Sequence, residues 1–191
     1  MSQKRILLVD DEANIRVLLS SILEAAGYIV DLAEDGFVAL HKLQHSHPDL
    51  LISDLRMPNM NGFELLSVVR TRFPQLPIIA ISGEFLSAVH EGPLADAFFQ
   101  KGSYTPPQLL EKVSDLLANP GTRKRVRTAA SPVWAPTGDA PVMLTCGSCL
   151  RSFPIDPCSD LEQSKQTDCI FCGAQLEVQL VAVGVVQSSG D

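Results

Sequence analysis

The sequence contains no apolar run long enough to cross a membrane. A membrane-spanning helix needs roughly 18 or more consecutive apolar residues, and no stretch of this chain reaches that length. The first apolar run, residues 6–9, is followed at once by Asp10-Asp11-Glu12, so a charged-then-apolar leader is also missing. We therefore expect a soluble, cytoplasmic protein that does not insert into membranes.

Cysteine is absent from the first 145 residues, and all five cysteines lie between positions 146 and 172. A reducing compartment makes disulfides unfavourable there. Cysteines clustered in this way are more typical of a metal site than of redox chemistry.

Positive charge is scarce as well, with 15 Lys and Arg against 22 Asp and Glu, for a net charge of −7. This balance argues against general affinity for nucleic acid or anionic membranes. Residues 1–119 hold 15 acids and 9 bases, residues 120–141 hold 1 acid and 4 bases, and residues 142–191 hold 6 acids and 2 bases. The chain is thus acidic, then basic, then acidic.

Short apolar strands alternate with amphipathic helices over residues 1–119. Strands are predicted at 4–9, 28–33, 50–53, 77–82 and 97–99. One helix is predicted to begin at Asp11 or Glu12, and a second to follow Asp35 as its cap. Two more are predicted over 62–73 and 107–117, and a weak helix over 84–95 is interrupted by Gly92-Pro93. The first helix is expected to bury Ile15, Leu18, Leu19, Ile22 and Ala26. This alternation predicts an α/β fold, with a five-stranded, doubly wound parallel sheet covered on both faces.

Polar residues follow the strands at the edge where such a sheet binds ligands. Asp10 and Asp11 follow the first strand, Asp54 ends the third, Ser82 ends the fourth and Lys101 follows the fifth. Crowded carboxylates need a cation, and Mg²⁺ fits because it prefers oxygen ligands. The set suits transfer of a phosphoryl group to a carboxylate. Acids at strand ends can also merely cap helices, but caps need no convergent lysine.

Four segments carry a family resemblance: "LLVDDE", "DLRMPNMNG", "IIAISG" and "FFQKG", in this order. Together they resemble the response-regulator receiver domain of two-component signalling, over about residues 4–118. The resemblance implies a flavodoxin-like fold and a phosphoryl group supplied by a sensor histidine kinase or a phosphotransfer protein.

The resemblance also implies a role for each matched residue. Asp54 is the phosphoacceptor. Asp10, Asp11, Asp54 and the backbone carbonyl of Arg56 hold Mg²⁺, while Lys101 and Ser82 contact the phosphoryl group. Phe98 matches an aromatic that moves on activation. An aromatic side chain on a sheet strand equally often has no switching role and only packs in the core. Gly102 stands where the family usually has proline, and the spacing from Ser82 to Lys101 is short, so we expect a non-standard signalling face.

Residues 120–141 have the composition of a linker, with Pro120, Pro132, Pro136 and Pro141. Its basic cluster is Arg123, Lys124, Arg125 and Arg127. The cluster fits either an arm that contacts nucleic-acid phosphates or a solvated tether. Trp134 fits either a docking segment or a cover for one of the flanking domains.

Two C-x-x-C units, Cys146/Cys149 and Cys169/Cys172, can supply four thiolates to one tetrahedral ion. Residues 142–183 resemble a zinc ribbon, a small β domain whose folding depends on the metal, and residues 184–191 are predicted to be a disordered tail. A rubredoxin-like iron site or a redox dithiol are the less favoured alternatives. Cys158 is not expected to bind the metal, because a tetrahedral site with four cysteines has no place for a fifth ligand.

The whole pattern predicts a phosphorylation-dependent response regulator rather than an enzyme. Its zinc-ribbon output would bind a protein partner. The alternatives are a nucleic-acid-binding transcriptional regulator that uses the ribbon and the basic linker, and a stand-alone phosphate sink.

Overall fold

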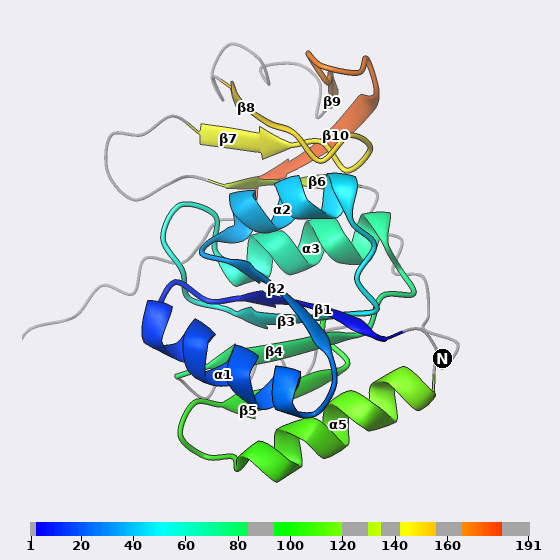
Figure 1. Cartoon of the computed structure of the whole chain (residues 1–191). Coiled ribbons are helices and arrows are strands. Elements are labelled where there is room, and N and C mark those ends of the chain that lie inside the picture. Colours follow the sequence, from blue (N-terminus) through cyan, green and yellow to red (C-terminus); the bar gives the residue numbers. More distant parts are fainter. Residues whose placement is uncertain (1–2, 84–93, 120–129, 135–141, 156–165, 181–191) are drawn as a thin grey trace, which may run out of the picture.

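The computed structural model describes residues 3–83, 94–119, 130–134, 142–155 and 166–180 (Figure 1). The N-terminal unit, residues 3–119, contains one sheet in the order β2-β1-β3-β4-β5. Its strands are β1 (Arg5–Val9), β2 (Ile29–Ala33), β3 (Leu50–Asp54), β4 (Ile78–Ser82) and β5 (Ala97–Gln100). All neighbouring strands run parallel. The predicted five-stranded parallel α/β sheet is therefore confirmed.

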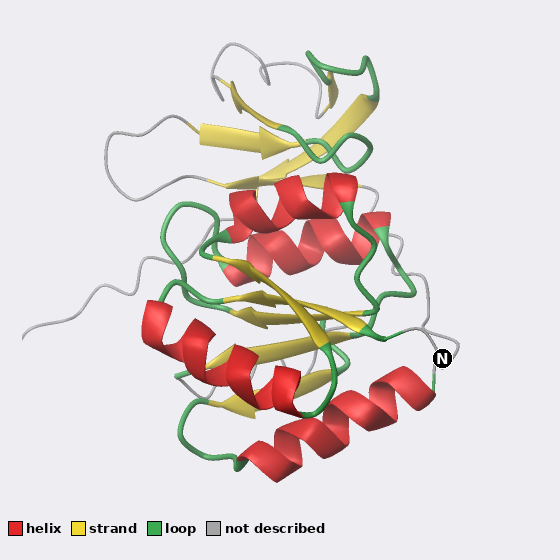
Figure 2. Ribbon diagram, viewed as in Figure 1, coloured by secondary structure: helices red, strands yellow, loops and turns green. Residues whose placement is uncertain are grey.

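Two pairs of helices cover the two faces of this sheet (Figures 1 and 2). The helices are α1 (Ala13–Ala25), α2 (Gly36–His45), α3 (Gly62–Arg72) and α5 (Pro106–Ala118). α1 and α5 pack over one apolar cluster, which includes Leu19, Leu23 and Leu109, and α2 and α3 pack over another. As predicted, the Asp35 carboxylate caps α2 by accepting a 2.9 Å hydrogen bond from the N–H of Val38. Most of the predicted helix over 84–95, including Gly92-Pro93, lies outside the described residues.

The buried face of α1 differs from the prediction. Leu18 is 56% exposed, and Ala26 lies beyond the helix at the surface. Leu23, which the prediction left out, is fully buried. Residues four apart lie along one stripe of a helix, and here the stripe through Ile15, Leu19 and Leu23 faces the sheet. Leu18 lies about 100° around the helix from Leu19 and so points to solvent.

A second sheet follows in the C-terminal part, in the order β8-β7-β6-β10-β9. Its strands are β6 (Ala130–Trp134), β7 (Val142–Thr145), β8 (Ser152–Ile155), β9 (Gln166–Asp168) and β10 (Gln175–Leu180). We call it the C-terminal sheet. β6 and β10 run parallel, and the other neighbouring strands run antiparallel.

The central strand β6 lies inside the segment predicted as linker, so that prediction was wrong for residues 130–134. Pro132 argued against a strand, because proline cannot donate to a ladder. In the structure Pro132 is in register with Gln179 of β10, while β7 pairs only with Val133 and Trp134, past the proline. The basic cluster at 123–127 and Cys158 lie outside the described residues.

The C-terminal sheet lies directly on α2 and α3 (Figures 1 and 2). Leu150 is 5% exposed and belongs to the same apolar cluster as the buried residues of α2 and α3. The side-chain amide of Gln44, on α2, donates to the carbonyl oxygens of Cys149 (3.3 Å) and Leu150 (3.2 Å). The two units therefore share a packed interface rather than a tether alone. Among the described residues, no helix is long and apolar enough to span a bilayer.

Candidate functional site

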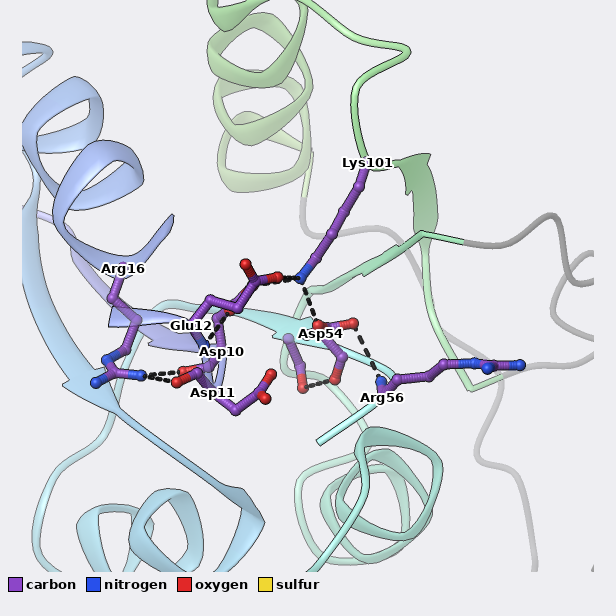
Figure 3. Close-up of polar contacts among 8 residues, drawn as sticks. Asp10, Asp11, Glu12, Arg16, Asp54, Arg56 and Lys101 are labelled. Carbon is purple, nitrogen blue, oxygen red and sulfur yellow. Dashed lines mark hydrogen bonds and ion pairs between the residues drawn. The ribbon is translucent and has the colours of Figure 1, made fainter. Parts of the chain in front are cut away.

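The predicted site residues of the N-terminal unit gather at one edge of its sheet (Figure 3). Asp54 is the last residue of β3, Asp10 directly follows β1, and Lys101 directly follows β5. Because these strands are parallel, their carboxyl ends meet at the same edge. Gly62, the first residue of α3, lies close to the backbone of Asp54: a Cβ placed on it would be 2.1 Å from the Asp54 carbonyl oxygen.

Lys101 is the centre of the charge network. Its Nζ lies 2.6 Å from Asp54 Oδ2 and 3.1 Å from Asp10 Oδ2. A third carboxylate, that of Glu12, lies 3.0 Å from the same ammonium group. The two aspartates are almost fully buried, and Glu12 is exposed. One ammonium group thus balances two buried carboxylates directly.

Backbone and side-chain donors hold the acids in place. The N–H of Glu12 donates to Asp10 Oδ1 over 2.9 Å, and the N–H of Arg56 donates to Asp54 Oδ1 over 3.1 Å. The Arg16 guanidinium donates to the carbonyl oxygens of Asp10 and Asp11. The sequence prediction missed the parts played by Glu12 and Arg16. The acidic run "DDE" and an arginine one turn into α1 were the available signals.

Burial and charge shift the ionisation of these groups. Burial raises the pKa of Asp10, against the opposing effects of the Glu12 N–H and Lys101. Burial alone would lower the pKa of Lys101, but its hydrogen bonds to Asp54 and Glu12 outweigh this and raise it. Lys101 is therefore a permanent cation. The protonated form of Asp10 is therefore favoured more than it would be in water, chiefly because the carboxyl is buried and only slightly because the Asp54 charge is near.

The remaining predicted residues surround this centre. Ser82 is fully buried at the end of β4, and its carbonyl accepts a 2.7 Å hydrogen bond from the N–H of Lys101. Phe98, on β5, is half-buried and packs against the apolar cluster of α2 and α3. The Arg56 side chain points away from the acids (Figure 3), which leaves only its backbone near them. Gly102 has φ of +77°, a conformation that suits glycine and that proline cannot adopt.

The carboxylates of Asp10, Asp11 and Asp54 form a potential cation site. One oxygen from each lies within 4.8 Å of the others. Hard oxygen donors of this kind suit Mg²⁺, which is usually held by one or two carboxylates, waters and phosphate oxygens. Asp11 is exposed, so solvent can complete the coordination. The donor set thus fits the ion that the sequence predicted.

Comparison with known proteins assigns the N-terminal unit. A family model of the response regulator receiver domain matches residues 6–100. The solved structure of a CheY-like receiver domain protein from Methanospirillum hungatei JF-1 is similar, with a TM-score of 0.59 and 33% identity, over 62% of this chain and 97% of that one. This chain belongs to the response regulator receiver family.

Other receivers show similar agreement. The response regulator TrrA of Thermotoga maritima, solved in complex with Mg²⁺-BeF, is 38% identical with a TM-score of 0.55, over 60% of this chain and 99% of that chain. The sensor protein EvgS of Escherichia coli K12 is 51% identical over 73 residues, and the regulator of RpoS of the same strain is 46% identical over 79 residues. These matches cover 38% and 41% of this chain, but only 6% and 23% of the two relatives.

The four predicted metal cysteines meet outside the region of the receiver match. Their sulfur atoms lie within 4.8 Å of one another. The Sγ atoms of Cys146 and Cys172 are 3.7 Å apart, as are those of Cys149 and Cys169. Four sulfurs about 2.3 Å from a tetrahedral zinc would be about 3.8 Å apart. The spacing therefore fits a four-thiolate metal site and excludes disulfides.

The two cysteine turns have the same hydrogen-bond pattern. In each, the residue two after the first cysteine donates its N–H to that sulfur: Ser148 to Cys146 at 3.3 Å, and Phe171 to Cys169 at 3.4 Å. Burial and the neighbouring thiols raise the pKa of Cys149 to about 12. At Cys169 the backbone donors of Phe171 and Cys172 outweigh burial and lower the pKa to about 7. Such donors stabilise a thiolate, the form that binds metal.

Proposed function

We propose that this chain is a cytoplasmic response regulator in which Asp54 accepts a phosphoryl group from a sensor histidine kinase or a phosphotransfer protein. The observation that carries the proposal is the contact of Lys101 with Asp54 and Asp10 at the carboxyl edge of a receiver sheet. Acids that merely capped helices would need no cation shared between them. The Mg²⁺ complex of TrrA supports a magnesium-dependent reaction.

The chemistry follows from the positions of these groups. An oxygen of Asp54 attacks the phosphorus of a phosphohistidine; the new O–P bond forms as the P–N bond breaks, and its electron pair stays on the imidazole nitrogen. Lys101, which contacts Asp54 Oδ2, can transfer one hydrogen bond to the incoming phosphoryl oxygens, and the Ser82 hydroxyl can donate another. Mg²⁺ held by Asp10, Asp11, Asp54 and the Arg56 carbonyl would neutralise the added negative charge.

Acetyl phosphate tests the phosphoacceptor without a kinase. With Mg²⁺, the wild type should form an acid-stable, alkali-labile acyl phosphate that is visible by intact mass. Asp54→Asn should form none, while Asp11→Asn should form it much more slowly and need more Mg²⁺. Labelling of the Asp54→Asn variant would exclude Asp54 as the acceptor.

We propose further that Cys146, Cys149, Cys169 and Cys172 hold one structural zinc ion. The sulfur spacing and the two matched turns support this ligand set. Iron can use the same four thiolates, so elemental analysis of protein purified without added metal decides between them. One zinc per chain is expected; one iron, or a folded C-terminal sheet without metal, contradicts the proposal.

The proposed output of the C-terminal sheet is binding to a protein partner, not catalysis. Ile170 and Phe171, at the tip of the second cysteine turn, are 69% and 47% exposed. Neighbouring exposed apolar side chains favour protein contact, and the segment 142–191 has 6 acids against 2 bases, which opposes phosphate contact.

The partner test is capture with and without acetyl phosphate, on wild type and on Phe171→Ser. Partners held by wild type and lost from Phe171→Ser support this output. Salt-sensitive binding to DNA or RNA that Phe171→Ser leaves intact would favour the nucleic-acid alternative. Unchanged signalling by Phe171→Ser would favour a phosphate sink.

A further inference from the structure

A cavity of about 330 Å³ lies where the first cysteine turn meets the ends of α2 and α3. Its walls come from both units: residues 43–45, 47 and 72–73 on one side, and residues 148–151 on the other. It shares no residue with the acidic site around Asp54. The volume is at the lower end of the range for small-molecule pockets.

The two arginine side chains on the wall of this cavity are positive, in a chain whose net charge is −7. Arg72 and Arg151 line it, together with the imidazoles of His45 and His47. None of the described residues that line it is Asp or Glu, although the chain has 22 acids and 15 Lys and Arg. Among the described residues, the only other ionisable group on its wall is the side chain of Cys149, which we propose as a zinc ligand.

Both arginines are oriented by aromatic rings. The guanidinium carbon of Arg72 lies 5.5 Å from the centre of the Phe73 ring, and that of Arg151 lies 5.3 Å from the centre of the Phe171 ring. Cation–π contacts at these distances are attractive and restrict the two side chains before any ligand arrives. Restricted guanidinium groups lose less freedom when they form paired hydrogen bonds to an oxyanion.

Helix ends explain only part of this arrangement. Arg72 is the last residue of α3 and His45 the last of α2, where cations favourably face the helix dipole. Arg151 belongs to the C-terminal sheet side and ends no helix. An arginine from each unit on the wall of one cavity, whose described lining holds no Asp or Glu, is the feature that helix capping leaves unexplained.

We propose that this cavity binds a small phosphate-bearing anion between Arg72 and Arg151. Both guanidinium groups offer paired N–H donors that match phosphate oxygens, and the Ser148 hydroxyl and the two imidazoles line the same wall. A volume above that of a single phosphate leaves room for an organic phosphate. Because the ligand contacts both units, its binding strengthens the attachment of the C-terminal sheet to the receiver.

Calorimetric titration of the full-length, metal-loaded protein with inorganic phosphate, pyrophosphate and AMP tests the site, at constant ionic strength and without Mg²⁺. Saturable binding is expected, with Arg72→Gln and Arg151→Gln each weakening it about tenfold or more. Lys112→Gln, on α5 at the opposite face of the receiver sheet, should leave it unchanged.

The three probes also identify the kind of ligand. Tighter binding of AMP than of inorganic phosphate assigns the cavity to an organic phosphate, and equal binding assigns it to free phosphate. Absence of saturable binding up to about 10 mM overturns the proposal. Binding that survives both arginine variants, or that Lys112→Gln weakens as much as they do, overturns it equally, because the anion would then lie elsewhere.

Discussion

Leu150 and Gly173 occupy equivalent positions in the two cysteine turns. Each donates its backbone N–H over 2.8 Å to the carbonyl oxygen of the cysteine four residues earlier. Each also has a left-handed backbone, with φ of +59° at Leu150 and +69° at Gly173. Glycine adopts this conformation freely, whereas a side chain costs about 1–2 kcal/mol there. Leucine therefore stands at the strained position in the one turn that faces the receiver.

Leu150→Gly tests whether burial of the leucine offsets that strain. The variant should keep the zinc that we propose at the four cysteines, because the turn itself is relaxed, yet lose the apolar contact with α2 and α3. Removing a buried leucine costs about 2–5 kcal/mol, so the free energy of unfolding should fall by about 1–3 kcal/mol in chemical denaturation. Gly173→Ala supplies the control: it adds strain at an exposed position and should cost about 1 kcal/mol. A Leu150→Gly protein as stable as wild type would contradict the expected loss, because burial of the leucine would then do no more than offset its backbone strain.

The interface also marks the limit of what the sequence could predict. Strand and helix periods are local, and they located all five receiver strands and the three charged groups that β1, β3 and β5 bring together, namely Asp10, Asp54 and Lys101. Gln44 and Leu150 are 106 positions apart, and no local pattern connects them. β6 was missed for a related reason: its pairing with β10 and β7 outweighs the local preference of Pro132 for a turn or an edge.

Gly62→Ala should disturb the phosphorylation site from the first turn of α3. The added Cβ would lie 2.1 Å from the Asp54 carbonyl oxygen and 2.6 Å from the Leu55 Cα, and both are backbone atoms that cannot rotate away. We expect a loss of about 2 kcal/mol in unfolding free energy and slower labelling by acetyl phosphate. Gly83→Ala is the matched control, since a Cβ there meets nothing within 4 Å. Equal labelling rates for the two variants would contradict this account.

Lys101→Gln should make the stability of the receiver depend strongly on Mg²⁺. The substitution removes the cation that balances the buried Asp10 and Asp54 carboxylates, so without divalent metal we expect a loss of about 2 kcal/mol. Mg²⁺ should recover much of that loss, because the more negative site binds the ion more tightly. Denaturation curves with and without Mg²⁺ give both values. If Mg²⁺ stabilises wild type and Lys101→Gln equally, the ion does not bind beside these acids.

The acidic site also shows which local details a sequence pattern leaves open. The strand ends identified Asp10, Asp54 and Lys101, because parallel strands bring such residues to one edge. Glu12 was assigned only a place at the start of a helix, and its contact with Lys101 depends on how α1 leaves the sheet. The glycine at 102 looked like a family departure, and its φ of +77° now supplies the physical reason for it.

Glu64→Gln should stabilise the protein at alkaline pH and have little effect at acidic pH. Glu64 accepts a 3.0 Å hydrogen bond from the N–H of Asn61 in the capping box of α3, while burial raises the pKa of its carboxyl from 4.5 to about 7. A carboxyl with a raised pKa in the folded state favours folding most below its unfolded pKa. That contribution is lost as the pH rises from about 4.5 to about 7, because the charged form is then forced into a buried place.

Glutamine keeps the acceptor for the Asn61 N–H but never becomes charged. The advantage of Glu64→Gln over wild type should therefore grow between pH 4.5 and pH 7, to about 1–3 kcal/mol, and stay constant above. Denaturation midpoints measured at pH 5 and pH 8 reveal this difference. Glu64→Ala separates the two effects, because it also removes the charge but leaves the Asn61 N–H without its acceptor, so its gain at pH 8 should be smaller. An equal gain for Glu64→Gln at both pH values would mean that the carboxyl is already ionised at pH 5 and that burial does not hold its proton.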